Sequence, residues 1–122
     1  MRLIIDLTAK EYMTEKEVGS HGIDYVKIKA SFGDKVPRPQ AVDQFIETVK
    51  QFVATHDDDK EIAVVCTHGT NRSGYLICRY IMDIMDQIEP EEAINAFETA
   101  RGESFPAEKP NLKNHLLSRE WI

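Results

Sequence analysis

The feature that most constrains this chain is a short polar segment, residues 66–74, which joins two apolar stretches of different periodicity. The run at residues 62–65 is continuous and mostly β-branched, as in a strand at the centre of a parallel sheet. The stretch after the segment has helical spacing, and its expected buried stripe consists of Leu76, Ile77, Tyr80, Ile81 and Ile84. A strand, a loop and a helix in this order direct backbone N–H groups and the positive end of the helix dipole toward one point, which suits an anion.

Two further segments have the patterns of strands. Residues 3–7 form a short apolar run typical of a buried strand. Residues 25–30 alternate between two faces of a strand, and the more solvent-exposed face is expected to consist of Tyr25, Lys27 and Lys29. Three apolar strands with helical segments between them favour an α/β layer fold, with a mostly parallel central sheet flanked by helices.

The helical segments are delimited by turn and cap residues. Apolar residues recur at helical spacing between positions 42 and 53, after a loop predicted over residues 31–39 from its glycine and prolines. Pro90 suits the first position of a helix, where a missing N–H does no harm, and Gly102 suits its end. A last helix is expected from residue 111 to residue 118. Because no linker interrupts the 122 residues, we expect one domain over residues 1–122.

Composition narrows the classes of protein to which the chain can belong. The net charge of -6 argues against general nucleic-acid binding, so a local positive site must hold any anionic substrate. The two cysteines, Cys66 and Cys78, are too few for the disulfide framework of a small secreted domain. Asp6 interrupts the apolar start of the chain, which argues against a signal peptide, and no apolar run approaches the ~20 residues of a membrane span. We therefore expect an intracellular protein, nuclear or cytoplasmic rather than secreted, with no membrane partner.

The polar segment has the residues that phosphate chemistry through a thiol requires. Cys66, at its start, would have its thiolate favoured by the loop amides and the helix dipole, which lower a thiol pKa from ~8.5 to roughly 3.5–7.5. The thiolate would attack phosphorus and form a phosphocysteine. Five residues further on, the planar fork of Arg72 would bind two phosphate oxygens at once. Ser73 would donate a hydrogen bond to the departing sulfur, and Cys78 is interpreted as a packing residue.

In this interpretation the residues between Cys66 and Arg72 wrap around the phosphate. Gly69 and Gly74 permit positive φ or a close approach of the backbone. His68 is expected to shape the loop rather than to act as an acid or base. The substrate phosphate would be bound by Thr67, His68, Gly69, Thr70, Asn71 and Arg72.

Non-catalytic interpretations of the same residues compete with these roles. A cysteine that ends a buried strand is usually a small hydrophobe, and a cysteine followed after five residues by an arginine is a weak pattern by itself. The glycines, Ser73 and the strand–loop–helix context make the pattern specific. The acidic run at residues 57–59 is interpreted as a solvated turn, so we expect no metal site and no cofactor.

At residues 66–80, CTHGTNRSGYLICRY, the chain resembles the cysteine-dependent, dual-specificity-like phosphatase superfamily, whose signature is Cys, five residues, Arg, then Ser or Thr. Within it, these residues resemble the RNA 5′-triphosphatase branch. That branch contains the triphosphatase domain of metazoan mRNA-capping enzymes and the stand-alone RNA 5′-phosphatases of animals and baculoviruses. Similar stretches occur at residues 5–8, 45–50 and 92–102, so the resemblance covers nearly the whole chain.

The resemblance implies the α/β cysteine-phosphatase fold, here shortened at the N-terminus, because the chain begins almost at the first matching strand. It also implies metal-independent removal of the γ-phosphate from 5′-triphosphate RNA ends, and of the β-phosphate in the stand-alone members. Val65 departs from the family, which usually has histidine before the nucleophile. This difference bears on how the thiolate is stabilised.

The general acid distinguishes two substrate classes. Protein phosphatases of the superfamily use an aspartate to protonate a leaving alkoxide, whereas a phosphoanhydride leaves as a phosphate anion without that help. Asp34 lies in the corresponding loop and is either that acid or a turn residue; we favour the turn, because turn chemistry explains an aspartate there. Basic residues that would guide a polyphosphate are Lys35, Arg38, Arg79, Arg101 and Lys109.

The sequence therefore predicts an RNA 5′-tri/diphosphatase that takes an RNA 5′ end as substrate and works through a phosphocysteine. One alternative is a dual-specificity phosphatase acting on phosphoprotein or another phosphomonoester, which a working Asp34 would favour. The other is a catalytically weak phosphate- or RNA-binding module, suggested by Val65 and the short N-terminus. The oligomeric state stays open.

Overall fold

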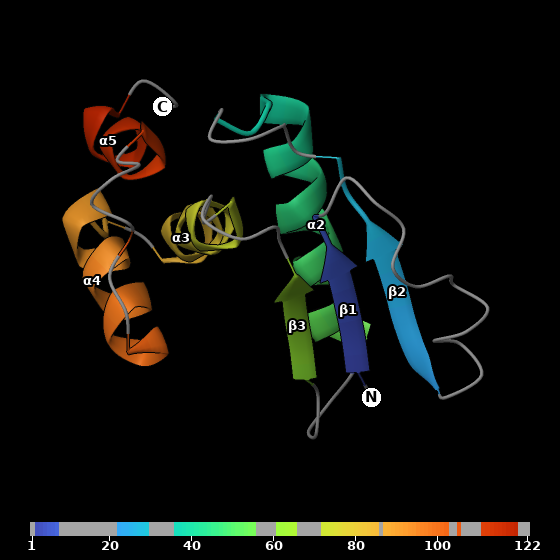
Figure 1. Ribbon diagram of the computed structural model, residues 1–122. Helices are drawn as coiled ribbons and strands as arrows, with labels where there is room; N and C mark the ends of the chain where they lie inside the picture. Colours follow the sequence, from blue (N-terminus) through green and yellow to red (C-terminus); the bar gives the residue numbers. More distant parts are fainter. Residues whose placement is uncertain are drawn as a thin grey trace.

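The computed structural model describes residues 2–7, 22–29, 36–55, 61–65, 72–85, 87–102, 105 and 111–119. Three strands and four helices follow one another in these parts of the chain (Figure 1). In order they are β1 (Arg2–Asp6), β2 (Ile23–Lys27), α2 (Pro39–Thr55), β3 (Glu61–Val65), α3 (Arg72–Ile84), α4 (Pro90–Arg101) and α5 (Asn111–Ser118). This arrangement confirms the predicted α/β architecture.

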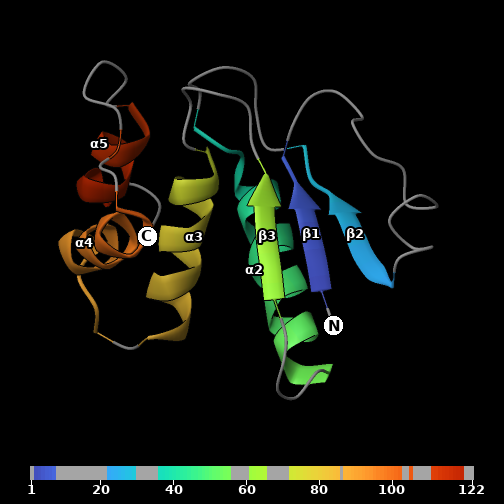
Figure 2. The ribbon, with the colours of Figure 1, turned by 60° about the horizontal axis from the view of Figure 1, so that its bottom comes forward.

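The three strands form a parallel sheet in the order β2-β1-β3 (Figure 2). In this sheet Ile4 of β1 pairs with Tyr25 on one side and with Ala63 on the other. The expectation that residues 62–65 form the central strand is wrong for the described sheet, because β1 lies in the middle and β3 at an edge. The side chains of β3 accordingly alternate between half-buried and exposed, instead of being buried on both faces.

Helix α2 connects β2 to β3 and covers one face of the sheet (Figure 1). It begins at Pro39, which the sequence places in the preceding loop, because proline is well suited to the first helical position. Its buried residues confirm the predicted helical spacing, although Val53 is 37% exposed. The buried residues are Ala41, Val42, Phe45, Val49 and Phe52.

Helix α3 is the central helix of the described structure. It lies between α2 on one side and the α4–α5 pair on the other, and it contacts all three (Figures 1 and 2). The predicted buried stripe is wrong at Ile84, which is 49% exposed, and it omits Tyr75 and Cys78, which are fully buried. A helix with neighbours on several sides buries more than one stripe, which explains the difference.

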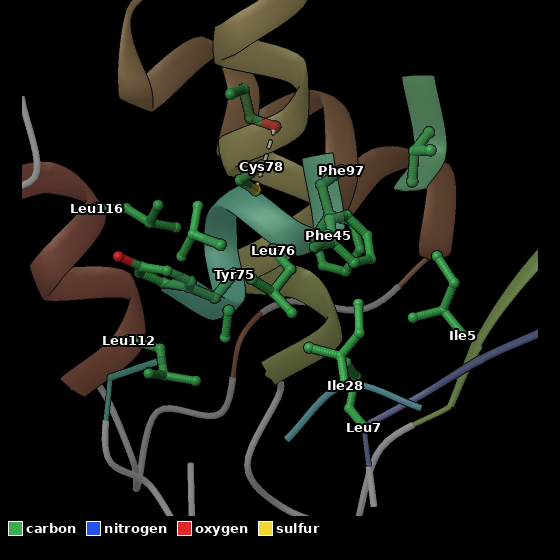
Figure 3. Close-up of a cluster of buried hydrophobic side chains, with 14 of the residues drawn as sticks. Ile5, Leu7, Ile28, Phe45, Tyr75, Leu76, Cys78, Phe97, Leu112 and Leu116 are labelled. Atoms are coloured by element: carbon green, nitrogen blue, oxygen red, sulfur yellow. Dashed lines mark hydrogen bonds between the residues drawn. The ribbon is translucent and has the colours of Figure 1, made fainter. Parts of the chain in front are cut away.

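The buried side chains of the sheet and helices form one hydrophobic cluster (Figure 3). Ile5 of β1 and Leu7, just after that strand, lie in one cluster with Phe45 of α2 and Leu76 of α3. Leu116 of α5 packs against the far side of α3. Each fully buried side chain of this size contributes about 1.5–3 kcal/mol to stability. The cluster therefore fixes α3 relative to the sheet.

The ends of the last two helices agree with the sequence. Pro90 is the first residue of α4, and Gly102 ends that helix with φ of 82°, its N–H donating to the carbonyl oxygen of Glu98 at 2.9 Å. The bounds of α5 are those predicted. None of the helices in the described ranges is long and apolar enough to cross a membrane.

Candidate active site

The strand and the helix of the predicted junction are present: β3 ends at Val65 and α3 begins at Arg72. The helix begins earlier than expected, because residues 72–74 of the predicted polar segment belong to α3. The six residues between β3 and α3 lie outside the described residues, so the roles assigned to them stay predictions. They are Cys66, Thr67, His68, Gly69, Thr70 and Asn71. Val65, directly before the predicted nucleophile, is 36% exposed. The two ends of the junction fix where the loop starts and where it returns.

Arg72 is placed in a position that favours binding of an anion. It is the first residue of α3 and is 3% exposed, and Asp6 is the other buried charged residue in the described part of the chain. A cation at a helix N-terminus opposes the helix dipole, and its burial removes hydration. An anion beside the guanidinium offsets both effects. Ser73, the next residue, is half-buried at the same end of α3.

Gly74 lies in close contact with aromatic side chains from a later part of the chain. A β-carbon at this position would lie 2.8 Å and 2.9 Å from two ring atoms of Phe97, and 3.1 Å from Phe105. The two rings stack with centroids 5.5 Å apart, and the Arg101 guanidinium lies 4.5 Å from the Phe97 ring centre. The first turn of α3 is therefore seated directly on aromatic side chains of α4 and the segment that follows it.

Tyr75 joins α3 to α5 through a partly buried polar contact. Its ring is fully buried, and its hydroxyl lies 2.9 Å from Nδ1 of His115 and accepts a hydrogen bond from Nη1 of Arg79 at 3.1 Å. Burial raises the pKa of Tyr75, and the nearby Arg79 opposes that rise. This network holds the helix that begins with Arg72.

The basic residues predicted to guide a polyphosphate are differently placed. Arg79 binds the Tyr75 hydroxyl and Arg101 stacks on aromatic rings, so both have structural contacts. Arg38 is exposed just before α2. Asp34, Lys35 and Lys109, as well as residues 57–59, fall outside the described ranges. The part of the chain with described side chains holds no cluster of three or more His, Cys, Asp or Glu that would suit a metal ion.

Cys78 has the properties of a packing residue, as predicted. It is fully buried, and burial together with Glu98 raises the pKa of its thiol to about 12 against the opposing effect of Arg101. Its sulfur lies 3.8 Å from the carbonyl oxygen of Ala93 on α4 (Figure 3). Because only the thiolate is a good nucleophile, Cys78 is inert at neutral pH.

The sequence interpretation missed a buried polar cluster at the carboxyl end of the sheet. Asp6 is 1% exposed, and its Oδ2 accepts a hydrogen bond from the Tyr25 hydroxyl and lies 3.4 Å from Nζ of Lys27. The prediction that Tyr25 lies on the more solvent-exposed face of residues 25–30 is therefore wrong, because Tyr25 is 9% exposed. The signal was present in the sequence, because an aspartate inside the apolar run at residues 3–7 needs a partner when it is buried.

Comparison with known proteins shows that the chain is similar to phosphatases. The family model "Dual specificity phosphatase, catalytic domain" matches residues 1–120. The RNA/RNP complex-1-interacting phosphatase homolog of Caenorhabditis elegans is 41% identical over 120 residues, which are 97% of this chain and 50% of that protein. The human RNA/RNP complex-1-interacting phosphatase is 36% identical over 98% of this chain and 36% of its own length. The tyrosine-protein phosphatase of Autographa californica nuclear polyhedrosis virus is 40% identical over 93% of this chain and 66% of its own length.

The chain thus spans half or less of the length of the nematode and human relatives. Among solved structures, PTPMT1 in complex with PI(5)P superposes with a TM-score of 0.68 at 18% identity, over 96% of this chain and 76% of that one. This likeness concerns the fold, and it agrees with a cysteine-phosphatase α/β architecture. With the family match over almost its full length, the chain belongs to the dual specificity phosphatase catalytic domain family.

Proposed function

We propose that the protein is an RNA 5′-tri/diphosphatase, in which residues 1–122 form one catalytic domain and Cys66 is the nucleophile. The observation that carries this proposal is the buried Arg72 at the first position of α3, six residues after Cys66 in the sequence. A buried guanidinium there is stabilised by a dianionic phosphate. The net charge of -6 makes such a local site necessary for a polyanionic substrate.

The chemistry proceeds in two displacements. The Cys66 thiolate attacks the terminal phosphorus, and the bond from that phosphorus to the bridging oxygen breaks, so that the shortened RNA leaves as a phosphate anion. Water then attacks the phosphocysteine, the P–S bond breaks, and inorganic phosphate and the thiolate are released. Arg72 holds two non-bridging oxygens in both steps, and Ser73 donates a hydrogen bond to the departing sulfur.

The choice of RNA as substrate is supported by two observations. Relatives from nematode and mammals, at 36–41% identity, are named RNA/RNP complex-1-interacting phosphatases. The segment 66–80 also resembles the RNA 5′-phosphatase branch. A phosphoanhydride needs no proton from the enzyme to leave, so this reaction requires nothing beyond the loop, Arg72 and Ser73.

Hydrolysis of phosphoprotein is the second candidate function, because two baculovirus relatives are named tyrosine-protein phosphatases. An ester substrate leaves as an alkoxide or phenoxide and requires a general acid. Asp34 is the residue that would supply it. The two functions therefore differ in their dependence on one side chain.

The decisive experiment measures phosphate release from 5′-triphosphate RNA and the trapping of a phosphoenzyme. Wild-type protein should release phosphate and give a phosphocysteine after rapid acid quench, whereas Cys66→Ser should do neither yet still bind inorganic phosphate. Arg72→Lys should lower the rate at least about 10²-fold, the scale for loss of one preorganised donor. Cys78→Ser is the matched control and should keep near-wild-type turnover. Substantial turnover by Cys66→Ser would refute the mechanism.

A further inference from the structure

Asp6 is a buried acid for which the proposed reaction gives no role. Its side chain is 1% exposed at the end of β1, and an isolated carboxylate in such a place is strongly unfavourable. Removal of one partner from a buried ion pair typically destabilises a protein more than the pair stabilises it. The groups that surround Asp6 therefore show how its buried charge is stabilised.

Two side chains of β2 bind the carboxylate. The hydroxyl of Tyr25 donates to Oδ2, and Nζ of Lys27 lies 3.4 Å from the same oxygen. Lys27 is itself largely buried, with 18% of its side chain exposed. Residues 6 and 27 are register partners in the parallel sheet, so their side chains project from the same face.

Other charged groups on the neighbouring described strands lie elsewhere. Arg2 and Glu61 pair with each other at 3.2 Å at the opposite end of β1 and β3. Asp24 is the register partner of Leu3 and projects from the other face. On the described strands, Lys27 is thus the cation that pairs with Asp6.

The cluster lies next to the start of the phosphate loop. Asp6 is the register partner of Val65, and the N–H of Leu7 donates to the carbonyl oxygen of Val65 at 2.8 Å. On the other side, the N–H of Ile28 donates to the carbonyl oxygen of Asp6 at 3.0 Å. Cys66 follows Val65 directly in the sequence. The end of β1 therefore joins β2 to the residue before the nucleophile.

We infer that Tyr25, Asp6 and Lys27 form a charge-balanced support for the nucleophile, in which Asp6 is a positioning residue and Lys27 cancels its negative charge. The inference rests on the proposed function, because it takes Cys66 as the nucleophile. A carboxylate without its lysine would leave an uncompensated negative charge beside Val65, the residue before Cys66. Like charges disfavour both a thiolate and an incoming phosphate. With the lysine present, the carboxylate anchors the strand ends without that opposition.

The test measures the rate of iodoacetamide alkylation of Cys66 as a function of pH, with the site identified by peptide mass spectrometry. Lys27→Met keeps the apolar stem and removes the charge, so the Cys66 midpoint should rise by about half a pH unit or more. Phosphate release should fall several-fold at neutral pH. Asp6→Asn added to Lys27→Met should return the midpoint toward the wild-type value, and Lys27→Arg should restore both readouts. Lys29→Met, which removes an exposed lysine two positions further on, is the matched control and should change neither.

The outcomes distinguish failure of this inference from failure of the proposed function. A midpoint in Lys27→Met equal to that in Lys29→Met overturns the inference while the proposed function stands. A wild-type Cys66 that titrates as an ordinary thiol near pH 8.5, with no phosphate release, overturns both. If Lys27→Met does not fold, Lys27→Gln carries the same test, because it keeps a hydrogen-bond donor for Asp6 without the charge.

Discussion

The ring of Phe97 occupies space that a side chain at position 74 would need. A β-carbon on Gly74 would lie 2.8 Å from Cε2 of Phe97, closer than real β-carbons approach other atoms. The ring is itself 8% exposed and packed against Phe105, so it has little freedom to withdraw. The start of α3, which contains Arg72 and Ser73, is thus placed by an aromatic side chain of α4.

Gly74→Ala should therefore destabilise the protein and disturb the phosphate loop together. Overpacking of a well-filled site costs about 1–3 kcal/mol, and the displaced helix start should lower phosphate release more than substrate binding. Thermal unfolding and kcat on triphosphate RNA measure the two effects. Phe97→Leu in the Gly74→Ala background removes the obstructing ring and should recover part of the lost rate. A Gly74→Ala protein with wild-type stability and rate would show that the contact has no such role.

The hydroxyl of Tyr75 should contribute to stability separately from its ring. Tyr75→Phe keeps the buried ring and removes the contacts to His115 and Arg79, which should cost about 1–2 kcal/mol. Amide hydrogen exchange should rise chiefly in α5, which loses its polar link to α3. Tyr80→Phe, at a half-buried position of the same helix, is the control and should have a smaller effect in urea unfolding. Equal effects of the two substitutions would contradict this assignment.

Cys78 should make the folded state less stable at alkaline pH. Its folded pKa is raised from 9.0 to about 12, so between these values the unfolded chain releases a proton that the folded chain retains. The unfolded state then binds fewer protons, and the free energy of unfolding falls as pH rises, by up to about 1.4 kcal/mol per pH unit for this group. Urea unfolding at pH 8 and pH 10 should show a smaller fall for Cys78→Ala than for the wild type. Identical falls would mean that the thiol is not protected by burial.

Local sequence patterns were sufficient where one element has one buried face or a distinctive cap. The end of β3 at Val65, the Pro90 start and Gly102 end of α4, and the extent of α5 all follow from short-range rules. Gly74 was predicted to permit positive φ or a close approach of the backbone, and not to contact an aromatic ring. The identity of the ring that approaches it depends on tertiary packing, which spacing along one helix does not encode.

The errors arose where burial depends on distant segments. An apolar run such as residues 62–65 indicates a strand, but not which strands lie beside it, so β3 was expected at the centre of the sheet. Cys78 appeared to lie off the buried stripe because α3 has more than one neighbouring helix. Tyr25 and Asp6 bind each other across 19 positions of sequence, and neither residue reveals the other through local periodicity.

The last prediction concerns the substrate, and it compares wild-type protein with Asp34→Asn. If Asp34 is a turn residue, the enzyme has no proton for a leaving alkoxide, so 5′-triphosphate and 5′-diphosphate RNA should exceed phosphotyrosine and phosphoserine peptides in kcat/KM by a large factor. Monophosphate RNA should accumulate, because its remaining phosphate is an ester with a poor leaving group. Asp34→Asn should change the RNA reaction little and depress any residual ester hydrolysis. If the peptide is the better substrate for the wild type and its hydrolysis collapses in Asp34→Asn, then Asp34 is a general acid and the protein-phosphatase function replaces the one proposed here.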